Sequence, residues 1–129
     1  IPMAPGNYGQ FESGIGAIET PVFLMTGARD GDLADDREGR PIWEALVGEQ
    51  HRRLQFADGG HFTFTSACNL VATQDNGCGP DFIPLDEAHQ VINTYAMAFA
   101  RFHLFGDDSG QAILNGDESL HEGVTLFRK

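Results

Sequence analysis

The sequence predicts an α/β fold, and three features of the chain support this class. Two short segments have the character of strands: 21–25 is a continuous apolar run after Pro21, and 51–57 places Leu54 and Phe56 on one face. Residues 41–47 between them have the spacing of a short helix, and residues 86–105 have that of a longer amphipathic helix. A strand, a helix and a strand joined by short connections are typical of a right-handed βαβ unit with a parallel sheet.

The size and charge of the chain limit its function. Its 129 residues are enough for one domain, and ten Phe and one Trp supply large side chains for a core. The formal net charge is −11, from 19 acidic and 8 basic residues. Because an acidic surface repels phosphate backbones and anionic lipids, we expect no nucleic-acid or membrane-surface partner. No apolar run approaches the roughly 20 residues of a membrane-spanning helix.

The first predicted strand follows an opening segment, 1–20, that we expect to be irregular. Pro21 is tolerated at a strand start because no ladder N–H is needed there. Val22-Phe-Leu-Met25 is continuously apolar, which indicates a strand buried on both faces. Gly27 then allows a sharp turn. The chain has neither a basic n-region nor an initiator Met, so we expect its start to have been cut or processed.

The helix predicted over 41–47 has Pro41 at its first position and Gly48 as its stop. The second strand, 51–57, follows at once. A long loop is expected over 62–85, which contains Pro and Gly and shows no clear periodicity.

Cys68 and Cys78 lie in this loop and are the two cysteines of the chain. We expect them to form a disulfide that pins the loop, with two free thiols as the alternative. A disulfide favours an oxidising compartment, and hence a secreted or periplasmic protein.

The helix predicted over 86–105 begins at Asp86, which we expect to cap it, and ends near Gly106. Its apolar positions recur at helical spacing; they are Ala88, Val91, Ile92, Tyr95, Ala96, Phe99 and Phe102. We expect residues 107–129 to form a polar tail with an apolar patch at 124–127. Two strands and two helices are too few for an independent doubly wound sheet, so we expect an upstream segment or a companion chain to complete it.

An acid and a base follow the two predicted strands. Asp30 comes three residues after Gly27, and His61 comes directly after Gly59-Gly60. Because the carboxyl ends of parallel strands meet at one sheet edge, we expect the two loops to converge. A carboxylate beside an imidazole is two parts of an acid–base relay, with Asp32 as the alternative acid. We expect ordinary roles for the other histidines, which are His51, His89, His103 and His121.

Two stretches carry a family resemblance. Leu24-Met-Thr-Gly27-Ala-Arg-Asp30 and Asp58-Gly59-Gly60-His61 resemble the acid and histidine turns in the C-terminal third of the α/β-hydrolases. The esterases similar to dienelactone hydrolase and to platelet-activating-factor acetylhydrolase are the closest. The resemblance covers residues 1–106, whose opening resembles the end of a preceding strand. It implies the C-terminal βαβα portion of a doubly wound, mostly parallel sheet, with a tail over 107–129.

The resemblance also implies a serine nucleophile, which this chain lacks. The family places it in Gly-x-Ser-x-Gly, and no such motif occurs here; Ser13 and Ser66 lack its glycines. Since the family's order is Ser, acid, His, we expect the serine on a companion polypeptide or a missing N-terminal segment. We expect this chain alone to be inactive.

The implied activity is hydrolysis of a small carboxylic ester without cofactor or metal, and the charge of the chain favours a neutral or apolar ester. Phe62 and Phe64 flank His61 and would alternate along an extended segment, so they would line an acyl pocket or pack in the core. Met3 would border this cleft by resemblance. The acidic run 30–36 lacks the EF-hand pattern, so we expect no calcium site. The alternatives are a non-catalytic interaction module that uses an open sheet edge, and a peptidase of the same fold.

Overall fold

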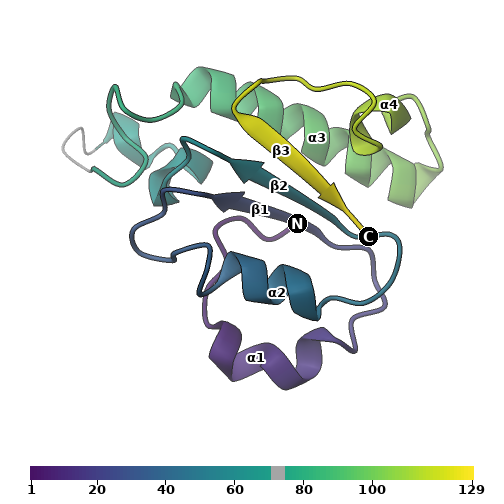
Figure 1. Cartoon of the computed structure of the whole chain (residues 1–129). Helices are drawn as coiled ribbons and strands as arrows, with labels where there is room; N and C mark the ends of the chain where they lie inside the picture. Colours follow the sequence, from purple (N-terminus) through teal and green to yellow (C-terminus); the bar gives the residue numbers. More distant parts are fainter. Residues whose placement is uncertain (71–74) are drawn as a thin grey trace.

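The computed structural model describes residues 1–70 and 75–129. Three strands, β1 (Phe23–Gly27), β2 (Arg52–Phe56) and β3 (Val124–Arg128), form one mixed sheet in this order. β1 and β2 are parallel, whereas β2 and β3 are antiparallel. The central strand is therefore β2, and the chain has the predicted α/β class (Figure 1).

Helices cover both faces of this sheet. α1 (Tyr8–Ile15) and α2 (Gly39–Ala45) lie together on one side, and α3 (Leu85–Phe105) with the short α4 (Gln111–Leu114) lies on the other (Figure 1). α2 connects the two parallel strands, which makes the predicted βαβ unit.

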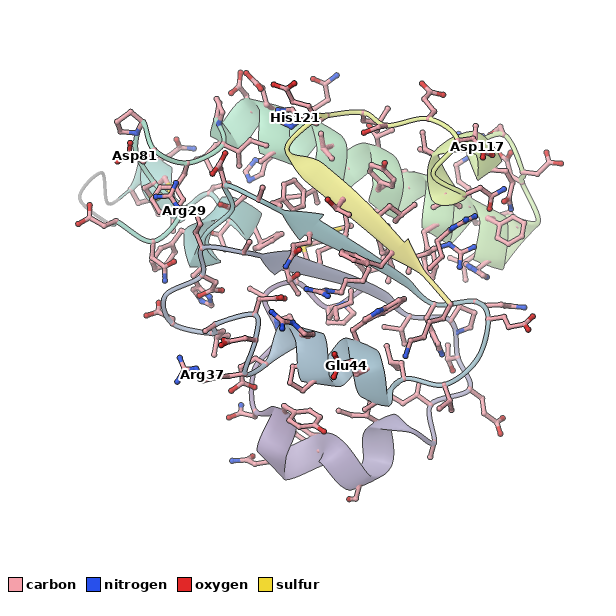
Figure 2. The ribbon with its side chains drawn as sticks, in the orientation of Figure 1. Arg29, Arg37, Glu44, Asp81, Asp117 and His121 are labelled. Carbon is pink, nitrogen blue, oxygen red and sulfur yellow. A yellow bond between two sulfur atoms is a disulfide. The ribbon has the colours of Figure 1, made fainter. Side chains whose placement is uncertain are left out.

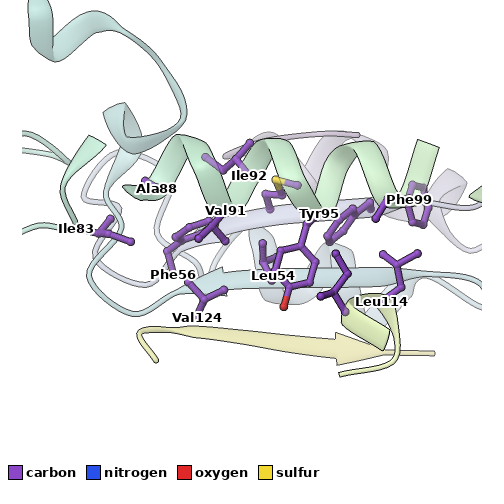
Figure 3. Packing of buried hydrophobic residues seen from close by; sticks show 14 residues of the cluster. Leu54, Phe56, Ile83, Ala88, Val91, Ile92, Tyr95, Phe99, Leu114 and Val124 are labelled. Carbon is purple, nitrogen blue, oxygen red and sulfur yellow. The ribbon is translucent and has the colours of Figure 1, made fainter. Parts of the chain in front are cut away.

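The core has two parts because β1 is buried on both faces, as its continuous apolar run predicts. Phe23 and Met25 belong to the cluster that packs against α3. Leu54 and Phe56 of β2 and Val124 of β3 join the same cluster (Figure 3). Leu24 points the other way and packs with Trp43 of α2 and Ile15 of α1. Each face of the strand thus anchors a different helical layer.

The long helix α3 buries the predicted face. Five of its seven predicted core residues are buried and two are partly buried against the same cluster. Gly106 ends it in the left-handed conformation, with φ of 67°. The expected cap was wrong: Pro84 occupies the N-cap, and Asp86 lies in the first turn without a capping hydrogen bond. Its carboxylate there still complements the positive end of the helix dipole.

Several boundaries differ from the sequence expectations. α2 begins at Gly39, two residues before Pro41, and ends at Ala45. Within 1–20, which we expected to be irregular, residues 8–15 form α1. The expected polar tail contains α4 and the strand β3, whose pairing partner lies far away in the sequence. The apolar patch in that segment is this strand.

The outer edge of β1 also has a partner. Met3 forms an isolated parallel bridge with Met25. The N–H of Met25 donates to the Pro2 carbonyl at 3.0 Å, and the N–H of Ala4 donates to the Met25 carbonyl at 2.9 Å. Thus the outer edge of β1 is covered in part by the bridge at Met3, and the outer edge of β2 is covered by β3.

The long loop after β2 is partly helical and carries the predicted disulfide. Its described residues include the 3₁₀ turns η1 (His61–Phe64) and η2 (Ala67–Asn69). Cys68 and Cys78 are bonded to each other, with their Cα atoms 5.4 Å apart. The predicted loop also includes residues 71–74, which lie outside the described residues. No helix in the described part of the chain is long and apolar enough to cross a bilayer.

Candidate functional site

The loops after β1 and β2 touch each other because glycines face each other there. The N–H of Arg29 donates to the carbonyl of Gly59 at 2.9 Å, and the N–H of Ala28 donates to that of Phe56 at 2.9 Å. A Cβ on Gly27 would lie 2.4 Å from the carbonyl oxygen of Gly59, closer than real contacts allow. The glycines that follow each strand are therefore a steric requirement of this contact.

This contact brings the predicted acid and base together. Nδ1 of His61 lies 3.0 Å from Oδ2 of Asp30. The other carboxylate oxygen of Asp30 accepts the backbone N–H groups of Asp32 at 2.9 Å and Leu33 at 2.8 Å. The Asp30 side chain is only 1% exposed, and these donors compensate for the burial of its carboxylate.

The pairing sets the tautomer of the neutral ring. Because a carboxylate accepts at Nδ1, that nitrogen carries the proton, and Nε2 presents a lone pair. The His61 side chain is 30% exposed, and its Nε2 has no hydrogen-bond partner among residues 1–70 and 75–129. An imidazole oriented in this way can accept a proton from a group placed beside it.

The structure pairs His61 with Asp30 and leaves Asp32, the alternative acid, on the surface, where it contributes only its backbone N–H. Asp35, farther along the acidic run, turns away to a buried ion pair with Arg53 at 2.6 Å. Within the described ranges, no three His, Cys, Asp or Glu side chains converge in a way that would hold a metal ion.

Asn76 belongs to this site although nothing in the sequence pointed to it. Its Oδ1 accepts the N–H of His61 at 3.0 Å and the N–H of Gly31 at 3.0 Å. Its backbone carbonyl accepts the N–H of Phe62 at 2.8 Å. In the sequence, Asp75-Asn-Gly77 is an ordinary turn signal, so only the tertiary structure reveals this contact.

The expectation for Phe62 and Phe64 needs correction, because they lie in the 3₁₀ turn η1 rather than in an extended segment. Phe64 packs edge-on against Phe56, with ring centroids 5.6 Å apart, and belongs to the core. The Phe62 ring lies 5.4 Å from that of His61 and is partly exposed. We expected Met3 to border the cleft beside His61. It pairs with the middle of β1, whereas the acid–base pair lies beyond the end of that strand.

Arg29 anchors the acid loop to the segment after the disulfide. Its guanidinium donates to the Asp81 carbonyl and lies 4.6 Å from the centre of the Phe82 ring. Arg29 and Asp81 are labelled on neighbouring segments in Figure 2. It also lies 3.6 Å from the carboxylate of Asp58 in the histidine loop. Both loops of the site are thereby held against a third segment of the chain.

The other histidines have contacts of their own. His51 is buried, accepts the N–H of Val22 at 3.1 Å and lies 2.7 Å from the carbonyl of Val47. His121 lies 3.3 Å from a carboxylate oxygen of Glu87.

Comparison of the chain with protein-family models, with curated proteins and with solved structures found no match. The resemblance of the two turns to a hydrolase family therefore stays an expectation. The two parallel strands bring Asp30 and His61 to one edge of the sheet, within hydrogen-bond distance of each other.

Proposed function

We propose that this chain supplies the acid and the general base of a Ser-His-Asp triad in a serine-type carboxylic ester hydrolase. The observation that carries the proposal is the buried carboxylate of Asp30 at Nδ1 of a partly exposed His61, whose Nε2 is open to a third group. The serine would come from a companion polypeptide or from an N-terminal segment outside this chain.

In this mechanism each group has one task. Nε2 of His61 takes the proton of the serine hydroxyl as its oxygen attacks the ester carbonyl. The imidazolium then donates this proton to the leaving alkoxide, and a water molecule repeats the cycle to release the acid. Asp30 stabilises the charged form of the ring through its own negative charge. It also fixes the ring orientation, because its other oxygen is held by two backbone N–H groups.

The sheet supports the same proposal. We infer that β1 and β2 are the last parallel strands of a doubly wound α/β-hydrolase sheet. The parallel bridge at Met3 places the opening segment on the outer edge of β1, where the preceding strand of such a sheet would pair. Helices on both faces and an acid–base pair at the carboxyl ends of the strands fit this architecture. The disulfide fits a secreted or periplasmic protein.

The test uses the native protein or complex that carries this chain, assayed with p-nitrophenyl acetate and butyrate. His61→Ala and Asp30→Asn should each lower kcat by about 10³–10⁴-fold. Asp32→Asn is the matched control, because it makes the same chemical change two residues away on an exposed side chain. Full esterase activity in His61→Ala would refute the proposal.

A second comparison separates ester from peptide chemistry, since a peptidase would use the same pair. Matched ester and anilide substrates with the same acyl group should differ in kcat/KM, with the ester strongly preferred. Preference for the anilide would assign the site to a peptidase. An assembly without any His61-dependent hydrolysis would favour the non-catalytic interaction module.

A further inference from the structure

We propose that Asn76 is a positioning residue that holds the acid loop and the histidine loop at a fixed separation. Its single amide oxygen accepts two backbone N–H groups, those of Gly31 and His61, both at 3.0 Å. Gly31 directly follows the acid, and His61 is the base itself. The consequence for catalysis rests on the proposed function, whereas the effect on the Asp30–His61 hydrogen bond does not.

One shared acceptor fixes geometry more tightly than two separate ones would. The two N–H groups belong to loops that follow different strands, and each must stay within hydrogen-bond distance of the same atom. A shift of either loop breaks one of the two bonds. The 3.0 Å contact between Asp30 and His61 is therefore maintained from the backbone as well as by the side chains themselves.

The backbone around Asn76 is held in place by three features. Its backbone carbonyl binds the N–H of Phe62, and the disulfide at Cys78 lies two residues farther along the chain. The adjacent Gly77 has φ of 107°, and its nitrogen would lie 2.4 Å from a Cβ on Gly60. The loop thus packs backbone against backbone, which fixes the position from which the side chain of Asn76 reaches Gly31 and His61.

The choice of an amide at this position has a chemical reason. Nδ2 of Asn76 is buried and has no hydrogen-bond partner within the described part of the chain. An unpaired buried donor costs free energy, and the two hydrogen bonds that Oδ1 of the same side chain accepts offset this cost. An aspartate would accept the same two N–H groups without an orphan donor, but it would add a second negative charge next to Asp30.

The first experiment measures the tautomer directly and needs no activity. The chain is labelled with ¹⁵N-histidine, and the ring nitrogens of His61 are observed by NMR above pH 8. In the unsubstituted chain we expect one tautomer with a proton on Nδ1. Asn76→Ala should give a mixture of tautomers and rapid exchange of the Nδ1 proton. Asn69→Ala, an exposed asparagine of the same loop, should leave both signals unchanged.

Asn76→Asp is the rescue variant. It keeps both acceptor contacts, so we expect the single tautomer to return. If Asn76→Ala fails to fold, Asn76→Gln moves the oxygen by one methylene and provides the same test. A single, protected Nδ1 proton in folded Asn76→Ala or Asn76→Gln overturns the proposal.

The second experiment measures kinetics in the native protein or complex. Asn76→Ala should lower kcat by about 10–100-fold with KM within twofold, because misplacement of the base affects the chemical step. Equal loss in Asn69→Ala, or unchanged kcat in Asn76→Ala, would contradict a positioning role. If His61→Ala retains esterase activity, the proposed function fails, and the NMR result alone then decides the role of Asn76.

Discussion

Gly27 and Gly59 lie so close together that a side chain on Gly27 would overlap the carbonyl of Gly59, at 2.4 Å from the oxygen and 2.7 Å from the carbon. Both obstacles are backbone atoms and cannot rotate away. The separation of the two strand-end loops, and hence that of Asp30 and His61, depends on this contact.

Gly27→Ala should therefore destabilise the protein by about 1–3 kcal/mol, since the loops must move apart. Urea unfolding monitored by circular dichroism measures this change. The control is Gly14→Ala in α1, where a Cβ meets nothing within 4 Å. There the alanine should be neutral or stabilising, because glycine is a poor helix former. Equal effects of both substitutions would show that the loop contact is not tight.

The ion pair of Arg53 and Asp35 gives a second prediction. Both side chains are almost fully buried, at 4% and 6% exposure, and Gln55 donates a further hydrogen bond to Asp35. Asp35→Ala leaves an unpaired buried guanidinium and should cost about 3–5 kcal/mol. Asp36→Ala, on the neighbouring exposed position, should change the free energy of unfolding by less than about 0.5 kcal/mol.

A chemical test of this pair follows from replacing both partners. Arg53→Met combined with Asp35→Leu should recover much of the lost stability, because no buried charge remains. A double variant as unstable as Asp35→Ala would mean that the two residues do not act as a pair. Urea midpoints of the two variants and the unsubstituted chain decide this.

Lys129 caps the end of a helix that lies far from it in the sequence. Its ammonium donates to the carbonyls of Trp43, Glu44 and Leu46, at 2.7, 3.1 and 2.6 Å. A cation at the C-terminus of α2 satisfies orphan carbonyls and complements the helix dipole. Lys129→Met should therefore lower stability by about 1–2 kcal/mol.

Arg128→Met is the matched control for this prediction, because Arg128 is the exposed neighbour on β3 and also loses a positive charge. Thermal unfolding at low and high salt separates a general charge effect from capping. If both variants lose the same stability, net charge rather than the helix end explains the change.

His103 makes stability depend on pH. Burial lowers the pKa of His103 below its ordinary value of 6.5, and the nearby charge of Arg52 lowers it further. Between this lowered pKa and 6.5 the unfolded chain binds more protons than the folded one, so the free energy of unfolding falls as pH falls. Well above pH 6.5, His103 no longer makes the free energy of unfolding depend on pH.

His103→Gln should remove this part of the pH dependence. The measurement compares urea midpoints at pH 7.5 and pH 5.5 in both proteins, and the decrease should be smaller in the variant. The ring also packs against Phe99, 4.3 Å between centroids, so a constant loss of stability at both pH values is expected in addition. An unchanged difference between the two pH values would contradict the prediction.

Local sequence patterns predicted the parts of the fold whose signals are local. The continuous run before Gly27 predicted a strand buried on both faces, and the helical spacing after residue 85 predicted the face of α3. The disulfide was predicted from two cysteines in one loop. The glycines after each strand indicated turns that bring Asp30 and His61 together.

The missed parts depend on contacts that are distant in the sequence. α1 contains two glycines, and its N-cap, Asn7, makes no capping side-chain hydrogen bond, so little local signal marked it. β3 is stabilised by pairing with β2, which a short apolar patch does not reveal. Asn76 acts through a single oxygen toward two remote backbone groups, and a turn residue of this type carries no sign of that role.

The position of β3 also determines the order in which the molecule can form during synthesis. β2 leaves the ribosome before α3 and β3, so one of its edges stays open until Val124–Arg128 has been made. Because this pairing closes a very long loop, it should be a late step that slows folding. Until then the nascent chain exposes an unpaired strand edge, which is the part most prone to aggregate.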